Sequence, residues 1–147
     1  MRIVVQRCKE ASCTVNNEII SEIKNGYLLL VGLTHEDSIK EVEYLAKKIA
    51  NLRVFEDEQG KLNKSILDVG YEILSISQFT LYGDAKKGNR PSFTKAMEPV
   101  KANELYLELT NILQSTYGIK TLNGAFGEMM DISLINNGPV TIILESK

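Results

Sequence analysis

The stretch from Gly26 to Leu33 reads GYLLLVGL, and its centre, Tyr27 to Val31, is the longest apolar run in the sequence. Apolar residues without alternation are typical of a central strand that is buried on both faces of a sheet. The run is too short to cross a membrane as a helix, which takes roughly 20 residues. We therefore expect a sheet built around this strand.

Strand patterns also precede this segment. Residues that favour strands recur in Arg2–Arg7, Ala11–Val15 and Glu18–Ile23. Asn16 and Asn17 separate the last two segments, and Asn tolerates the positive φ of a tight turn. The N-terminal part of the chain is thus predicted to supply three strands before the central one.

After the central strand the apolar pattern becomes helical. Ser38 and Glu41 have the spacing of a capping box, and apolar residues then recur at intervals of three and four. We expect a helix over 38–52. A second helix should begin near Pro99, because proline is tolerated in the first turn, and should stop at Gly118.

Strand patterns return at Tyr71–Ser77, Ile119–Leu122, Met129–Ile135 and Val140–Leu144. The order of strands, helix, strand, helix and strands predicts an α+β protein. We expect residues 1–147 to form a single domain, in which two main helices cover a curved, barrel-like mixed β-sheet.

A Gly-Pro pair interrupts the last strand pattern, SLINNGPVTIIL, which runs from Ser133 to Leu144. Asn137 and Gly138 have the chemistry of a turn, and Pro139 would open a returning strand, where its missing N–H costs little. The residues alone favour a hairpin here. The alternative is that Gly138 and Pro139 form a rigid functional element.

The composition is that of an ordinary soluble globule, with 44% hydrophobic and 24% charged residues and a formal net charge of −2. Without a global basic field, a nucleic-acid partner would have to be held by a local patch. No signal-peptide pattern is visible, because the chain starts directly in a strand pattern. We therefore expect a cytoplasmic protein with no membrane partner.

Cysteine and histidine are scarce. The spacing of Cys8 and Cys13 matches no zinc or redox motif, which predicts buried or edge thiols. His35 is the only histidine, so a His-rich metal site is excluded and any Ser-His-Asp triad would have to use this residue. We expect neither a metal nor a cofactor.

The segment from Ser75 to Phe93, SISQFTLYGDAKKGNRPSF, is the best candidate for a functional site. Ser77, Gln78 and Thr80 follow directly on an apolar strand, and a long loop comes next. Polar groups at a strand end beside a loop often form a site. The alternative is an edge strand whose polar side chains point outward.

The loop that follows is basic. Between Asp84 and Lys101, five basic residues and two acidic ones leave an excess of +3 on a chain whose net charge is −2. This asymmetry favours a phosphate-bearing partner, with Lys86, Lys87 and Arg90 as the contacts. The alternative is a solvated loop.

Four blocks in this sequence resemble the D-aminoacyl-tRNA deacylases, and the resemblance extends from MRIVVQR at the start to GPVTI near the end. The blocks are SQFTL at Ser77–Leu81, NGPVT at Asn137–Thr141, RVFEDEQGKLNKSI at Arg53–Ile66 and KGNRPSF at Lys87–Phe93. This resemblance implies the fold of that family and a homodimeric hydrolase that removes D-amino acids from the 3′ end of tRNA.

The resemblance also implies how such a protein selects its substrate. Gly138 and Pro139 would form a cis dipeptide that enters the partner subunit's site and excludes L-amino acids. Arg7, at the end of VQR, would brace this element. Two composite active sites per dimer are expected on this basis.

The same resemblance places SQFTL at the floor of the pocket, so that Ser77, Gln78, Phe79 and Thr80 would be the catalytic segment. The sequence FGEMM, from Phe126 to Met130, lies where the family often has FGADM or FGAMM. Its members Phe126, Met129 and Met130 are expected to help hold the terminal adenosine. Glu128 departs from the family pattern.

Hydrolysis of the aminoacyl ester needs a positioned water and hydrogen-bond donors for the developing oxyanion. The backbone N–H groups of Gln78, Phe79 and Thr80 are the candidate donors. No base accompanies Thr80 in the sequence, so we favour RNA-assisted hydrolysis in which the adenosine 2′-OH helps to activate water. Thr80 as nucleophile is the alternative within this function.

Two other functions remain open at this stage. An ordinary esterase would use Thr80 or Ser77 with His35 and would need no RNA. A non-catalytic RNA- or metabolite-binding module would bind tRNA and leave the ester intact.

Overall fold

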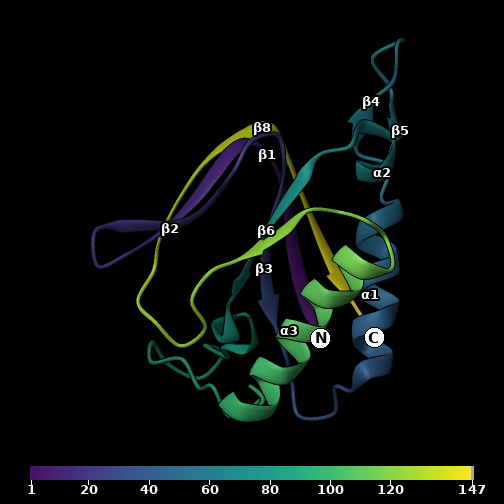
Figure 1. Ribbon diagram of the computed structural model, residues 1–147. Coiled ribbons are helices and arrows are strands. Elements are labelled where there is room, and N and C mark those ends of the chain that lie inside the picture. Colours follow the sequence, from purple (N-terminus) through teal and green to yellow (C-terminus); the bar gives the residue numbers. More distant parts are fainter. Residues whose placement is uncertain (147) are drawn as a thin grey trace.

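The computed structural model describes residues 1–146 (Figure 1). The strands are β1 (Arg2–Val15), β2 (Glu18–Ile23), β3 (Gly26–Gly32), β4 (Phe55–Glu56), β5 (Leu62–Lys64), β6 (Glu72–Ser77), β7 (Thr121–Asn123) and β8 (Asp131–Glu145). The helices are α1 (Ile39–Asn51), α2 (Ile66–Val69) and α3 (Pro99–Ser115), with a 3₁₀ helix η1 (Phe79–Tyr82). The main strands and the two long helices follow the expected order, whereas β4, β5, α2 and η1 were not predicted.

The main sheet has the strand order β2-β1-β3-β6-β7, and β8 also pairs with β1. Strands β3, β6 and β7 are parallel to one another, whereas β1 is antiparallel to β2, β3 and β8. Strand β2 curls back toward β6 and β7, so that the mixed sheet is nearly closed. The predicted barrel-like α+β fold is confirmed.

Two hydrophobic cores lie on either side of this sheet. Helices α1 and α3 lie side by side against one face (Figure 1), and their buried residues, such as Leu45 and Leu109, join Ile3 and Leu29 of the strands. A smaller core fills the curl of the sheet and contains both cysteines, which are free and buried. The prediction of buried thiols for these cysteines is confirmed.

The helix signals in the sequence are confirmed. Ser38 and Glu41 form the predicted capping box at the start of α1, and Pro99 stands in the first turn of α3. The chain leaves α3 through Gly118, whose φ of +66° lies in the left-handed region. None of the helices in residues 1–146 is both long and apolar enough to cross a membrane.

The predicted hairpin around Gly138 is wrong. Both halves of SLINNGPVTIIL belong to one strand, β8, and both pair with β1. Cys8 pairs with Asn136 and Gln6 with Thr141. From Asn136 to Thr141 there are five residue steps on β8, and they face only two steps on β1. The three extra residues form a large, irregular bulge.

The bulge lies where β8 passes from one core to the other. Ile132 and Leu134 pack against the smaller core, whereas Ile142 and Leu144 pack against the larger one. The Gly-Pro pair therefore interrupts the pairing without reversing the strand. Likewise, the two strands predicted before Val15 are a single long strand, β1.

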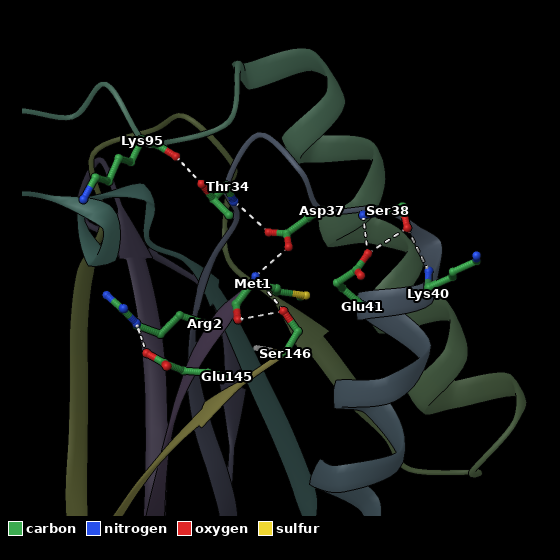
Figure 2. Close-up of polar contacts among 10 residues, drawn as sticks. All are labelled: Met1, Arg2, Thr34, Asp37, Ser38, Lys40, Glu41, Lys95, Glu145 and Ser146. Carbon is green, nitrogen blue, oxygen red and sulfur yellow. Dashed lines mark hydrogen bonds and ion pairs between the residues drawn. The ribbon is translucent and has the colours of Figure 1, made fainter.

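A polar cluster ties the ends of β1 and β8 to the loop that precedes α1 (Figure 2). The amine of Met1 forms a buried ion pair with Asp37 Oδ1 at 2.6 Å and donates to Ser146 Oγ at 2.9 Å. Asp37 Oδ2 accepts from Thr34 N–H at 2.7 Å, and Thr34 Oγ1 donates to Lys95 O at 2.5 Å. The cluster thus fixes the loop after β3 against the segment that leads into α3.

Candidate active site

A pocket of about 250 Å³ lies at the carboxyl ends of the parallel strands β3 and β6, beneath the start of α3. Its wall is largely apolar, as is usual for ligand pockets. The residues that line it are Val31, Leu33, Ser77, Gln78, Phe79, Met97, Pro99, Ala102, Phe126 and Gly127. Four residues that the sequence predicted, Ser77, Gln78, Phe79 and Phe126, are thus brought together.

The end of β6 shapes one side of the pocket. Gln78 N–H donates to Val31 O at 2.7 Å, and the chain then turns into the 3₁₀ helix η1. Thr80 lies on this turn beside the lining residues, and its Oγ1 accepts a hydrogen bond from Gln78 Nε2. The Gln78 side chain therefore acts as a donor toward Thr80, so it provides no base to activate that hydroxyl.

The backbone donors of this turn differ from our expectation in one respect. The Gln78 N–H group already serves Val31 O and is not free to bind an oxyanion. Phe79 and Thr80 open η1, and the first N–H groups of a helix have no acceptor within it. These two amides are therefore the donors that the segment can offer to a substrate oxygen.

None of the described residues that line the pocket carries an ionisable side chain. Tyr106 lies behind the wall, where its hydroxyl donates to Ser75 O at 2.6 Å, and burial raises its pKa to about 12. Its ring also lies 5.7 Å from that of Phe126. Tyr106 therefore supports Phe126 and stays protonated at neutral pH, so the pocket has no acid–base group of its own.

The side chains of the segment from Phe126 to Met130 lie in different places. Phe126 lines the pocket and packs against the larger core. Met130 instead packs against the smaller core, where its Sδ would lie 2.7 Å from a Cβ added at Gly124. Met129 is 88% exposed and lines no part of the pocket. Within one chain, only Phe126 of these three predicted residues faces the pocket.

The Gly138–Pro139 peptide bond is cis, as the resemblance implies, and both residues are exposed. Arg7 is 4% exposed and holds the bulge from below, since its Nε donates to Asn137 O at 2.9 Å. Its Nη1 donates to Val54 O at 2.7 Å and reaches Glu56 Oε2 at 3.1 Å. The predicted contact between Arg7 and this element is present.

The bulge and the pocket lie toward opposite ends of β3. Arg7, which faces the bulge, pairs with Tyr27, whereas Val31 lines the pocket. Four residue steps separate Tyr27 from Val31, or roughly 13 Å at the rise of a strand. A chain therefore does not bring its own Gly138 and Pro139 into its own pocket.

The predicted basic residues Lys86, Lys87 and Arg90 lie on an exposed loop. Paired backbone hydrogen bonds between Asp84 and Ser92, both 2.8 Å, close the loop at its base. The carboxylate of Asp84 accepts from Lys86 N–H, and this hydrogen bond is the main cause of its lowered pKa. The loop is thus a defined structure that presents three cations to solvent.

His35 stands outside the pocket. It is exposed, and its Nε2 lies 2.6 Å from Thr94 O. Because neither Ser77 nor Thr80 has a hydrogen bond with His35 among residues 1–146, the geometry gives no support to an esterase built on this histidine.

Sequence reasoning missed the apolar part of the wall. Val31 and Leu33 end the central strand, and Met97 and Ala102 flank the start of α3. Each could be predicted as core, but their meeting at one strand edge depends on how α3 packs. The only usable signal was the coincidence of a strand end and a helix start.

A family model described as D-Tyr-tRNA(Tyr) deacylase matches residues 4–145. Curated relatives called D-aminoacyl-tRNA deacylase include those of Brevibacillus brevis (58% identical, over 99% of this chain and all of the relative) and Bacillus thuringiensis (57%, over the whole of both chains). A third, from a Geobacillus species, is 54% identical over this whole chain and 96% of the relative.

Solved structures share this fold. One titled c-Myc DNA Unwinding Element Binding Protein superposes with a TM-score of 0.94 at 47% identity, over 100% of this chain and 99% of that one. Another, titled as a probable eukaryotic D-amino acid tRNA deacylase, has a TM-score of 0.83 at 15% identity, with 97% of each chain covered. The second likeness shows the fold alone.

The family model and the curated relatives define a hydrolase of ester bonds. Within that class, the chain belongs to the D-Tyr-tRNA(Tyr) deacylase family. The family predicted from the four sequence blocks is thus confirmed.

Proposed function

We propose that this protein is a cytoplasmic D-aminoacyl-tRNA deacylase, which hydrolyses the ester between a D-amino acid and the terminal adenosine of tRNA. Relatives 54–58% identical over nearly the whole chain support this activity. The observation that carries the mechanism is a pocket without an ionisable lining residue beside two backbone N–H groups without a helical acceptor.

In this mechanism the ester carbonyl oxygen accepts from the N–H groups of Phe79 and Thr80. A water oxygen attacks the carbonyl carbon, and the adenosine 2′-OH helps to remove its proton. The bond to the 3′-oxygen then breaks, and that oxygen leaves with a proton. Fixed donors aimed at the developing oxyanion stabilise the transition state without reorganisation. Gln78 holds this turn through its backbone N–H and its side-chain amide, and Ser77 lines the pocket beside it.

Because no base lies beside Thr80, we favour attack by a water that the substrate 2′-OH activates over direct attack by Thr80. A threonine nucleophile needs an adjacent base or a lowered pKa. The hydrogen-bond partner of Thr80 Oγ1 that the structure describes is the Gln78 amide nitrogen, which can only donate. The RNA therefore supplies a group that the pocket lacks.

The protein acts as a homodimer with composite sites in this proposal. Gly138 and Pro139 are exposed at the surface, and neither lines the pocket of its own chain. A second subunit can offer the same element to the first subunit's pocket. Because a dimer axis makes this exchange mutual, two complete sites result.

Chirality is selected by exclusion. Exchanging D for L at Cα swaps hydrogen and side chain, so an element on one side of Cα clashes with an L side chain only. The carbonyl oxygens of Gly138 and Pro139 provide that element, and Arg7 holds it through Asn137 O. Glycine carries hydrogen on both sides, so glycyl-tRNA is also a substrate.

The tRNA is held at two places. Phe126, which lines the pocket, contacts the terminal adenosine. Lys86, Lys87 and Arg90 contact the phosphate backbone, and their exposure on a closed loop supports this role. Binding should weaken with salt by a slope of about −0.7 to −0.9 per phosphate contact.

A panel of three substrates tests the function. D-alanyl-tRNA and glycyl-tRNA should be deacylated at enzyme levels that leave L-alanyl-tRNA intact. If no D-aminoacyl ester is cleaved while tRNA still binds, the protein is a binding module and the deacylase assignment fails. If glycyl-tRNA resists along with L-alanyl-tRNA, the site recognises the D side chain itself and exclusion is the wrong mechanism.

A further inference from the structure

Two aromatic rings stand exposed beside the pocket. Phe79 is 58% exposed and Phe93 is 39% exposed, and their ring centroids lie 5.2 Å apart in an edge-to-face arrangement. Large apolar side chains on the surface lose the free energy that their burial would contribute. An exposed pair that also touches a pocket is therefore a candidate contact surface.

The local backbone is built around this pair. Gly83 follows η1, and a Cβ added there would lie 3.0 Å from Phe93 Cε1 and 2.9 Å from Thr80 O. A glycine at this position therefore lets the ring of Phe93 approach the turn that carries Phe79. The two rings are held together by the same segment that supplies the backbone donors of the site.

The pair lies between the pocket and the basic loop. Phe79 lines the pocket on one side. On the other side, Asp84 and Ser92, the neighbours of Gly83 and Phe93 in the sequence, close the base of the loop. An extended strand of RNA running from the pocket to the cations of this loop can therefore pass over the two rings.

We infer that Phe79 and Phe93 form a stacking platform for the base of the nucleotide that precedes the terminal adenosine of tRNA. The inference rests on the proposed function and adds a second nucleotide contact to it. The 3′ end of tRNA is single-stranded, so its bases are free to stack on aromatic side chains. Aromatic rings next to a basic groove are the usual means of binding a single strand.

Charge favours RNA as the occupant. The three cations Lys86, Lys87 and Arg90 are exposed beyond the rings, while the nearby acid Asp84 is engaged by Lys86 N–H and lies 3.8 Å from Lys95 Nζ. A polyanion can thus place a phosphate on the loop and a base on the rings at once.

The test combines a protein variant with a changed substrate. Phe93→Leu removes the ring, and a tRNA with an abasic nucleotide before the terminal adenosine removes the base. Phe93→Leu should lower kcat/KM for intact D-alanyl-tRNA about tenfold, the scale of one base–aromatic stack. The same variant should act as well as the parent on abasic D-alanyl-tRNA and on the D-alanyl ester of adenosine alone.

Two further variants separate stacking from structure. Phe93→Tyr keeps a ring and should retain the parent rate on intact tRNA. Tyr44→Leu removes a ring of similar exposure, 48%, from α1 and should have no effect. Equal losses of Phe93→Leu on all three substrates would mean that the ring only shapes the pocket, and no loss on intact tRNA would mean that it contacts no base.

Binding provides a readout that does not depend on hydrolysis. Uncharged RNA hairpins with a tRNA-like 3′ end, intact or abasic before the last nucleotide, are titrated by fluorescence anisotropy. The parent should prefer the intact hairpin about tenfold, and Phe93→Leu should lose that preference. If the preference survives the variant, the platform is refuted even where deacylation occurs. If the preference exists but no ester is cleaved, the deacylase proposal fails and the platform stands.

Discussion

The pocket and the Gly138 bulge lie toward opposite ends of β3, and they differ in the charge of the side chains around them. The described lining of the pocket has no ionisable side chain. The bulge is held by Arg7, a cation that is only 4% exposed and that reaches two carbonyl oxygens and one carboxylate. The pocket is therefore lined by neutral side chains, whereas the bulge is held by a buried cation.

The difference shows where side chains act in this molecule. In our proposal the groups that act at the pocket are backbone N–H groups, and the side chains there shape the space. The groups that act at the bulge are the carbonyl oxygens of Gly138 and Pro139, and the charged side chain of Arg7 fixes their position. In our proposal neither the pocket nor the bulge takes the proton from the attacking water. The 2′-OH of the substrate adenosine helps to do this.

The largest expected effect comes from changing the substrate. A D-alanyl-tRNA that ends in 2′-deoxyadenosine should be deacylated about 10²–10⁴-fold more slowly, the usual contribution of a proton-transfer group. Thr80→Val should cost far less. A normal rate with the deoxy substrate together with an inactive Thr80→Val variant would contradict this prediction. It would show that Thr80 in the pocket is the nucleophile.

Arg7→Met tests the charged end. It leaves Asn137 O and Val54 O without their donor, and an unsatisfied buried group costs about 1–3 kcal/mol. We expect the free energy of unfolding in urea to fall by about 2–5 kcal/mol, and the protein that remains folded should hydrolyse L-alanyl-tRNA. Lys9→Met, at an exposed position of the same strand, is the control and should change neither quantity.

The Cys8 thiol, which lies beside the bulge, should make the free energy of unfolding depend on pH in the alkaline range. Burial raises the pKa of this thiol from 9.0 to about 11. Because the folded state holds the proton more tightly, the contribution of this thiol to stability is nearly constant below pH 8 and falls as the unfolded thiol ionises, by up to about 1.4 kcal/mol per pH unit. Urea unfolding at pH 8 and pH 10 should show a drop of about 1.3 kcal/mol that Cys8→Ala lacks. An equal drop in both proteins would assign it to other groups.

Glu56→Gln should have a smaller effect. The carboxylate is 49% exposed, so its ion pair with Arg7 is weakened by water. Its pKa is lowered first by its own backbone N–H and then by Arg7. We expect L-alanyl-tRNA hydrolysis to rise less than about fivefold. A rise as large as that of Arg7→Met would show that the carboxylate, rather than the two carbonyls, fixes the guanidinium.

His35→Ala should have the smallest effect, because the ring is exposed and bonds to a backbone oxygen outside the pocket. Deacylation rates should change less than about twofold, as for other surface substitutions. A loss of about 10²–10⁴-fold would restore the esterase mechanism and overturn the neutral character of the pocket.

Local signals in the sequence were sufficient for the central strand and the two main helices, but not for β4, β5, α2 and η1. The apolar run at Gly26–Leu33 predicted the central strand, and the spacing of Ser38 and Glu41 predicted the start of α1. Each signal depends on residues close in sequence. The strand end at Ser77 located one side of the pocket for the same reason.

The hairpin failed because its signal was local and the deciding contacts were not. Asn137 and Gly138 have turn chemistry, but both halves of β8 find partners on β1, at positions such as Gln6 and Cys8. Pairing over about 130 residues cannot be read from a tetrapeptide. The apolar wall of the pocket was missed for the same reason, since Met97 and Ala102 reach it only through the packing of α3.

The pairing of β1 with β8 also has a consequence for synthesis. During translation β1 leaves the ribosome long before β8, yet the two strands pair along β1 from Arg2 to Thr14. Until the final residues emerge, this edge of β1 stays open, and contacts of such long sequence separation form slowly. A nascent chain halted before residue 131 should therefore expose a long strand edge, the feature that recruits chaperones or invites aggregation.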